Sequence, residues 1–196
     1  MPAAPEPIHA HAIDNLRFIR EAMARAGEFT AIPGWGGVLM GVSAIVTAIV
    51  SGPPDNSRRW LAIWLADAGV ATVIALATMT LKAHRLGVPL STAAPARRFA
   101  LAYAPPLAAG AVLTIFFAAT GQAARLPGCW LLLYGTAAAT GGALSVRVVP
   151  LMGLGFMTLG AVAFAAPAAS GHWLMAAGFG GLHIVCGLVI AKKYGG

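Results

Sequence analysis

The feature that most constrains this chain is a series of six apolar segments, each close to the length that crosses a lipid bilayer. A helix rises 1.5 Å per residue, so about 20 apolar residues span a hydrocarbon core of about 30 Å. The sequence therefore predicts an all-α, polytopic membrane bundle with six transmembrane helices. The predicted helices are 32–51, 60–81, 99–120, 128–144, 148–166 and 173–191.

Composition and charge support this fold class. The 196 residues are 59% hydrophobic and only 10% charged, whereas about a quarter of the residues in a soluble domain are charged. A net charge of +7 would suggest a nucleic-acid partner in a soluble protein. Here the basic residues lie between apolar segments, where lipid and membrane potential act on them. We therefore expect a lipid bilayer around the chain and no nucleic-acid partner.

The distribution of Lys and Arg predicts the orientation. Ten of the thirteen fall on the side of the predicted bundle that holds both termini, and only Arg58, Arg59 and Arg125 fall on the other. Positive residues concentrate on the cytoplasmic side, so both termini are predicted to be cytoplasmic, in a bacterial inner membrane. The aromatic residues agree, because Trp60, Trp130 and Trp173 each open an even-numbered helix, where this model has its outer interface.

Three regions follow from this layout. Residues 1–31 form a cytoplasmic tail with an amphipathic helix, residues 32–191 form the transmembrane domain, and residues 192–196 form a short cytoplasmic tail. Within the first region, apolar residues recur at helical spacing between Ile13 and Phe29. This pattern predicts a helix that lies against the cytoplasmic face.

Small residues are frequent in the apolar segments. Gly37 and Gly41 have Gly-x-x-x-Gly spacing, which serves either tight packing within the bundle, the interpretation we favour, or dimerisation. The helix entrances IPGW at 32–35 and LPGCW at 126–130 resemble each other. They indicate either an inverted three-plus-three repeat, as in many transporters, or a chance recurrence of common entrance residues.

Asp67 is the one acidic residue placed inside a predicted span, about 10 Å below the outer interface. A carboxylate at that depth costs about 2.5 to 3.5 kcal/mol to bury, so it needs a partner, water or a proton. Two interpretations stay open. Asp67 is a proton or cation site, or it is a structural carboxyl that is protonated or bonded to a neighbouring helix.

His183 lies in the middle of the sixth predicted span, about 5 Å deeper than Asp67. If the two residues face a common polar space, they form a proton relay; otherwise His183 is a packed histidine held by hydrogen bonds. Cys186 shares its helix face, but two ligands do not make a zinc site, and no second histidine at that depth serves haem. We predict no metal and no cofactor. Cys129 and Cys186 fall at different depths, so no disulfide is expected.

Pro105 and Pro106 lack backbone donors and predict a break or kink in the third span, as a hinge near a pathway or as a packed kink. No motif for an enzyme occurs, so catalysis is not expected. The sequence favours a small transporter or channel for a solute or ion, with proton coupling as one form of it. The alternative is an accessory, sensory or assembly protein that binds a second copy of the chain or another membrane protein.

Overall fold

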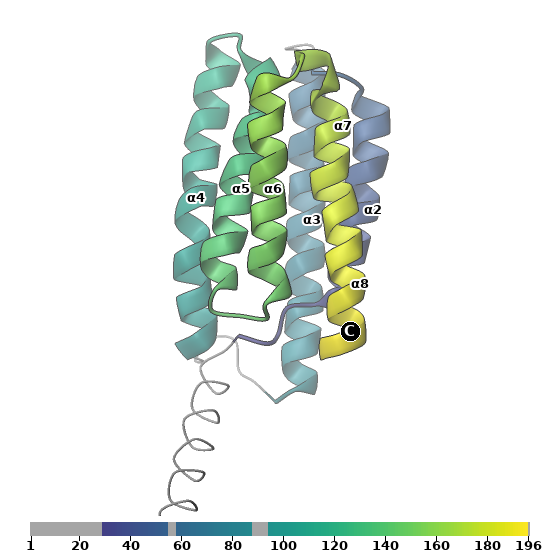
Figure 1. Cartoon of the computed structure of the whole chain (residues 1–196), viewed down its shortest axis with the longest axis vertical. Coiled ribbons are helices and arrows are strands. Elements are labelled where there is room, and N and C mark those ends of the chain that lie inside the picture. The colour runs from purple at the N-terminus through teal and green to yellow at the C-terminus, as the bar shows by residue number, and fades with distance from the viewer. Residues whose placement is uncertain (1–28, 55–57, 88–93, 196) are drawn as a thin grey trace, which may run out of the picture.

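The computed structural model describes residues 29–54, 58–87 and 94–195, and they form a bundle of helices that run side by side (Figure 1). The predicted helical fold is confirmed for this part of the chain. Five helical segments are long and apolar enough to cross a membrane, while α5 has only 17 residues. The elements are α2 (Gly34–Ser51), α3 (Arg58–Arg85), α4 (Ala94–Ala119), η1 (Ala123–Arg125), α5 (Leu126–Gly142), α6 (Val148–Ala165), η2 (Ala168–Ser170), α7 (Gly171–Met175), the π-helical turn η3 (Ala176–Leu182) and α8 (His183–Tyr194).

The helix boundaries follow the chemistry of the connections. The α5–α6 connection is short, as predicted, and Pro150 lies in the first turn of α6, where its missing N–H costs no helical bond. The last pass is continuous from α7 through η3 into α8. The predicted amphipathic helix between Ile13 and Phe29 lies outside the described residues, apart from Phe29 itself.

Glycines bring two pairs of helices into backbone contact. A Cβ on Gly153 of α6 would lie 2.5 Å from the Ala139 nitrogen of α5. A Cβ on Gly187 of α8 would lie 2.7 Å from the Gly34 oxygen of α2, and one on Gly41 would lie 2.7 Å from the Gly180 oxygen. The Gly-x-x-x-Gly pattern of α2 therefore packs against the last pass of the same chain, which confirms the intramolecular interpretation.

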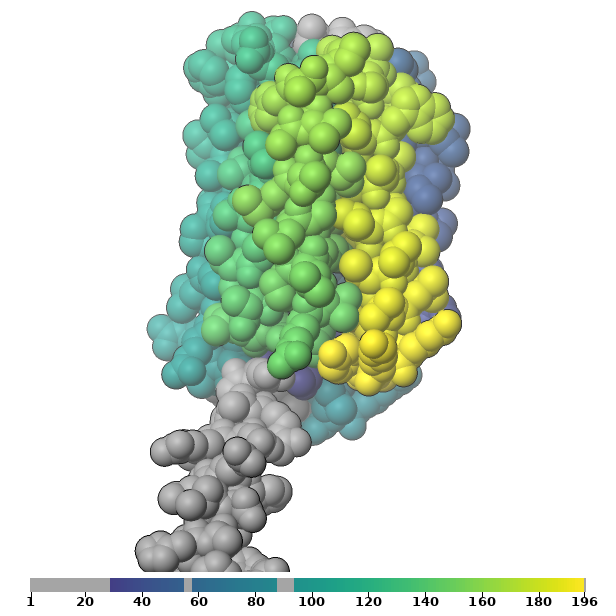
Figure 2. Space-filling model, viewed as in Figure 1, coloured from purple at the N-terminus to yellow at the C-terminus, as the bar shows by residue number. Residues whose placement is uncertain are grey.

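The neighbours of α2 and α5 show a related pattern. The first lies against α3 and α8, and the second lies against α4 and α6. A three-plus-three repeat would pair the helices in this way. Their glycines differ, however, because Gly41 packs on the last pass whereas Gly135 packs on Gly153 and Met157 of α6. On the near face, α6 lies beside the run from α7 to α8 (Figure 2).

Two helices lie at the periphery. Only 6% of the membrane-length segment of α3, and 6% of that of α4, is buried in the bundle, against 39% for α2. Large apolar side chains such as Val73 and Leu76 on α3, and Val112 and Ile115 on α4, are exposed. In water such surfaces would drive aggregation, but in a bilayer they face lipid.

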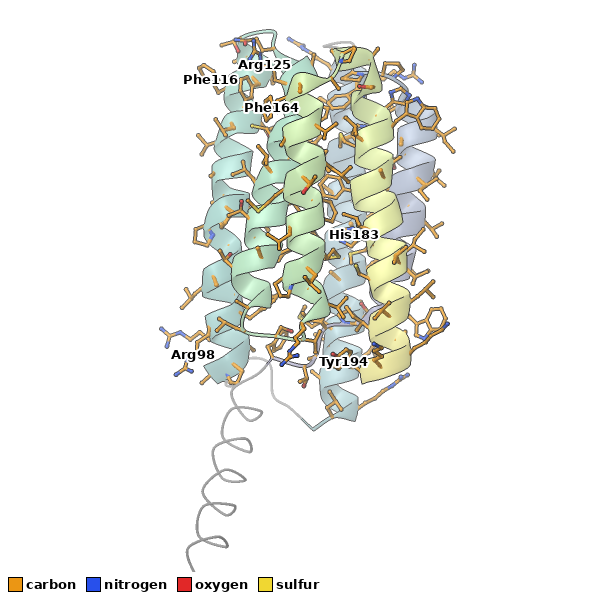
Figure 3. All side chains as sticks on the ribbon, in the orientation of Figure 1. Arg98, Phe116, Arg125, Phe164, His183 and Tyr194 are labelled. Atoms are coloured by element: carbon orange, nitrogen blue, oxygen red, sulfur yellow. The ribbon has the colours of Figure 1, made fainter. Side chains whose placement is uncertain are left out.

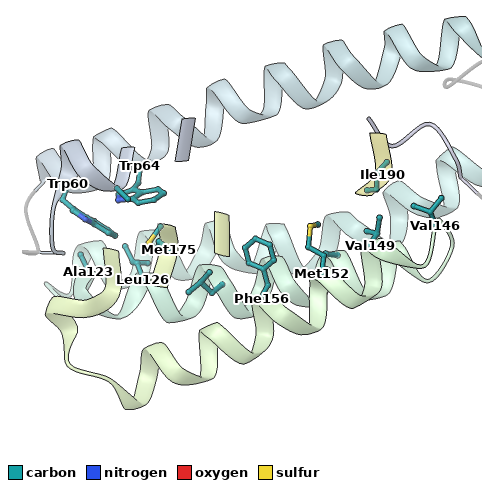
Figure 4. Close-up of a cluster of buried hydrophobic side chains, with 13 residues drawn as sticks. Trp60, Trp64, Ala123, Leu126, Val146, Val149, Met152, Phe156, Met175 and Ile190 are labelled. Carbon is teal, nitrogen blue, oxygen red and sulfur yellow. The ribbon is translucent and has the colours of Figure 1, made fainter. Parts of the chain in front are cut away.

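The buried core runs along the length of the bundle (Figure 4), from Trp60 and Ala123 at one end to Val146 and Ile190 at the other. Trp60 is 1% exposed and stacks on Trp130, with ring centroids 5.7 Å apart, while Trp173 is 64% exposed. Of the three tryptophans assigned to an outer aromatic belt, Trp60 is therefore buried and Trp130 is partly buried against it. Their position at the helix starts reflects packing as much as an interface.

The other end of the bundle joins three distant parts of the chain. The Phe29 nitrogen donates to the Leu144 oxygen at 2.8 Å, and the Ser145 hydroxyl donates to the Phe29 oxygen. The buried Lys82 ammonium donates to the Ile32 oxygen at 3.0 Å and to the Gly195 oxygen at 2.6 Å. Residue 29 and the end of α8 therefore lie at the same end of the bundle.

Candidate functional site

Asp67 is half-buried on α3 and faces α2. Its carboxyl group has two hydrogen-bond partners, the hydroxyls of Ser43 and Thr47, which lie one helical turn apart on α2. Thr47 is itself buried. Among the residues that the structure describes, Asp67 is the only acidic one. The structure thus places this carboxyl between two helices rather than toward lipid.

The hydroxyl of Ser43 limits how this cluster can be bonded. It donates to the Met40 oxygen at 2.9 Å, and a hydroxyl has only one proton to donate. With its proton on the Met40 oxygen, Ser43 accepts from Asp67, and the carboxyl supplies the proton of that contact. With its proton turned toward Asp67, Ser43 donates to the carboxylate, as Thr47 does. The cluster can therefore bond Asp67 both as a protonated acid and as a carboxylate.

His183 lies about midway along the bundle (Figure 3) and is 5% exposed. Its Nε2 lies 2.7 Å from the Tyr134 hydroxyl of α5. Aromatic rings enclose the imidazole, with centroids 5.3 Å away for Phe156 of α6 and 6.3 Å away for Phe179, which stacks nearly parallel to it. His183 therefore points into the core of the bundle.

The second ring nitrogen of His183 is less well satisfied. Nδ1 is buried and has no hydrogen bond of good geometry among the described residues. Its polar neighbours are the carbonyl groups of Gly178 and Phe179, both in the wide turn η3. π-Helical turns are rare and occur often at functional sites. The sequence predicted an irregular helix in the third pass, but the structure has one in the sixth, directly before His183.

Asp67 and His183 have different partners. Asp67 is bonded by α2, whereas His183 is bonded by α5, and the His183 backbone lies beside Gly37, about 9 Å along α2 from Ser43. Aromatic rings lie between the two regions. The ring of Trp64, one turn before Asp67, has its centroid 6.5 Å from that of Phe179. The geometry thus gives two separate polar sites, and no described hydrogen bond joins them.

Pro105 and Pro106 do not break the third pass, because α4 runs unbroken from Ala94 to Ala119. Proline removes a helical donor and leaves the carbonyl group four residues earlier without its usual partner. For Pro106 that group is the Ala102 carbonyl, and it accepts a hydrogen bond from the Thr140 hydroxyl of α5 at 3.0 Å. This hydroxyl has one proton, which it shares with the Thr136 oxygen of α5 at 2.9 Å, so Thr140 supplies part of the bonding that Pro106 removes.

Metal ligands do not cluster in the described residues, where no group of three or more His, Cys, Asp and Glu side chains could hold an ion. Cys129 and Cys186 are both free thiols, in agreement with the prediction of no disulfide. His9 and His11, two histidines near the start of the sequence that could also bind a metal, lie outside the described residues.

Sequence reasoning missed three residues at these sites. Tyr103 and Tyr134 lie in the predicted spans, and a buried tyrosine hydroxyl needs a partner, so both could have been singled out. Lys82 was counted as a loop residue, yet it is only 6% exposed. Nothing in the local sequence shows that two backbone oxygens from distant segments meet its ammonium group.

Comparisons of the chain with protein-family models, with curated proteins and with solved structures found no match. The fold class therefore rests on the helices themselves, and the function must be argued from the two polar sites.

Proposed function

We propose that this protein is a small membrane transporter that couples movement of a solute or ion to movement of a proton, with Asp67 as the proton-binding residue. The observation that carries the proposal is the bonding of the Asp67 carboxyl. Ser43 already donates to Met40, so the cluster of Asp67, Ser43 and Thr47 has a place for one proton on the carboxyl. A proton also removes the cost of a charge at membrane depth.

Release of that proton would require a local change on α2. An ionised Asp67 accepts hydrogen bonds only, so the Ser43 hydroxyl would turn from the Met40 oxygen toward the carboxylate. The protonated and ionised forms therefore have two different bonding patterns between α2 and α3. A difference of this kind lets protonation bias the relative position of two helices.

The attachment of α3 suits such a change. Its buried residues are Trp60 and Trp64 at one end and Lys82 and Ala83 at the other, while Asp67 and the segment that follows it pack mainly on α2. A helix that is held at its ends and packs loosely between them can shift without unfolding the core. This is the part of the bundle in which we place the transport movement.

The proposed topology has six spans, with both termini in the cytoplasm of a bacterial cell. In the described residues, seven Lys and Arg lie at the end that holds Lys82 and Gly195, and three lie at the other. Reporter fusions at Asp55, Ala124 and Ser170 should read outside, and fusions at Ala94 and Gly196 should read inside. A cytoplasmic signal at Ala124 would refute this topology.

Transport is tested with the full chain reconstituted in vesicles that contain a pH-sensitive dye. A potassium gradient with valinomycin sets the membrane potential, and Na⁺, amino acids and small organic cations are added in turn. The wild type should move protons together with at least one of these solutes, and Asp67→Asn should lose that coupled flux. Thr72→Val is the matched control, because Thr72 is exposed on the same helix and its hydroxyl donates to the Ala68 oxygen of that helix. Equal coupled flux in wild type and Asp67→Asn would contradict the proposal.

The second candidate is an accessory or assembly protein. It is favoured by the large exposed apolar surfaces of α3 and α4, which a partner helix could cover in place of lipid. Gentle purification and identification of what co-purifies would separate the two functions. A stoichiometric partner protein, together with no flux for any solute, would favour the accessory role.

A further inference from the structure

A line of polar side chains crosses the core from α4 to α8. It consists of Tyr103 on α4, Tyr134 on α5 and His183 on α8, and we call these three residues the polar line. The Tyr134 hydroxyl lies 2.7 Å from His183 Nε2. The rings of Tyr103 and Tyr134 meet edge-on with centroids 6.0 Å apart, and their hydroxyls interact. The polar line thus joins three helices inside an apolar core.

The neighbours of His183 favour one direction of the hydrogen bonds. The carbonyl groups of Gly178 and Phe179 lie near the ring and can only accept, so they favour a neutral ring with its proton on Nδ1. Nε2 is then an acceptor, and Tyr134 donates to it. The Tyr134 oxygen can in turn accept from Tyr103. All donors therefore point the same way, from α4 toward the turn η3.

A purely structural Tyr–His pair would have its remaining nitrogen fully bonded. Buried polar atoms usually have a partner, yet His183 Nδ1 lacks one of good geometry, and it lies at the one π-helical turn of the described residues. A positively charged ring would donate more strongly to both nearby carbonyl groups. The carbonyl groups of Gly178 and Phe179 would therefore stabilise an imidazolium at this position.

We propose that His183 is a second proton-binding residue, which receives its proton through Tyr134 and Tyr103. A proton that arrives on the Tyr103 oxygen releases the proton already there to Tyr134, and Tyr134 passes its own to His183 Nε2. Each hydroxyl gains one proton and loses one, so only His183 changes charge. This inference rests on the proposed transport function and adds a second proton-binding residue at a distance from Asp67.

The surroundings of His183 contain few groups that could compete for this proton. Tyr134 contacts it directly and Tyr103 lies behind Tyr134, while Cys186 follows three residues later on the same helix. The turn η3 and α6 present the rings of Phe179 and Phe156. Beside the His183 carbonyl, α2 presents the backbone of Gly37. In the described residues around this ring we find no charged side chain, so the charge would be balanced by carbonyl dipoles.

The first test measures the histidine directly. The full chain is labelled with ¹⁵N-histidine and studied by solid-state NMR in phospholipid bilayers, with His183→Gln to identify the signal. We expect the Nδ1–H tautomer in the neutral form, and a change in the Nε2 signal in Tyr134→Phe. An Nε2–H tautomer in the wild type, or the same Nε2 signal in Tyr134→Phe, would overturn the proposed direction of the polar line.

The second test uses the vesicle assay for proton flux. Tyr134→Phe and Tyr103→Phe remove one hydroxyl each and should lower the flux by roughly a hundredfold, the low end of what positioned proton transfer contributes. Tyr194→Phe is the control, because Tyr194 is exposed. If Asp67→Asn abolishes the flux but Tyr134→Phe leaves it unchanged, this inference fails while the proposed function stands. If the wild type shows no flux, the proposed function fails. Spectra of the ¹⁵N-histidine sample recorded over a range of pH then decide the inference, and a His183 ring that never becomes doubly protonated overturns it.

Discussion

The helices α8 and α3 carry the two candidate sites, and they are held in the bundle in different ways. The first contacts α2 along its length through glycines, with Gly187 against the Gly34 oxygen, and places His183 in the core. The second is anchored near its ends, by Trp60 and Trp64 and by Lys82, and most of its surface is exposed. The bundle thus has a closely packed part around His183 and a peripheral helix that carries Asp67.

The largest expected effect comes from a larger residue at the α2–α8 contact. Gly187→Val places side-chain atoms where the Gly34 oxygen and the Val38 nitrogen lie 2.7 and 2.8 Å from a Cβ, so the two helices must separate. We expect a loss of about 3 kcal/mol, the upper part of the range for overpacking, measured by thermal unfolding in detergent. The matched variant is Gly69→Val on α3, where a Cβ meets nothing within 4 Å. Equal losses in the two variants would mean that α8 is packed no more closely than α3.

The next effect concerns the anchor at the end of α3. Lys82→Met removes the ammonium group that donates to the Ile32 and Gly195 oxygens, so both oxygens lose this hydrogen bond. Hydrogen bonds from charged groups contribute about 1.5 to 3 kcal/mol, so we expect a loss of about 2 kcal/mol and faster proteolysis near the end of α8. Lys192→Met is the control, because Lys192 is exposed. If both variants unfold at the wild-type temperature, Lys82 does not anchor α3.

A smaller effect is expected at Asp67. The amide of Asp67→Asn can donate to Ser43 and accept from Thr47, as the protonated acid does, so the free energy of unfolding should change by no more than about 0.5 kcal/mol. Thermal unfolding of the variant beside the wild type measures this. A loss above about 2 kcal/mol would mean that a buried partner needs the negative charge, and the protonated form of the cluster would then be wrong.

The overall architecture was predictable because a bilayer imposes a length and an apolar composition on each helix. Asp67 and His183 could be singled out for the same reason, since polar groups in apolar segments are rare. The partners of these groups could not be predicted. Ser43, Thr47 and Tyr134 are distant in sequence, and their approach depends on which helices become neighbours.

Two features were not predicted, because the sequence shows local chemistry and not the contacts that compensate for it. Pro105 and Pro106 predicted a break or kink in the third span, but α4 is not broken, and Thr140 lies in position to donate to the Ala102 carbonyl. No prediction was made of the π-helical turn at residues 176–182. Both features depend on the neighbouring helices, and the sequence of the segment alone does not predict them.

Asp67 is proposed to hold a proton in this structure. Infrared spectroscopy of the full chain in lipid bilayers tests it directly, because a protonated carboxyl group has a C=O stretch well separated from that of a carboxylate. The difference between wild type and Asp67→Asn at neutral pH should show the band of a protonated carboxylic acid, and Ser43→Ala should shift it. A difference spectrum that contains only carboxylate bands would contradict the account.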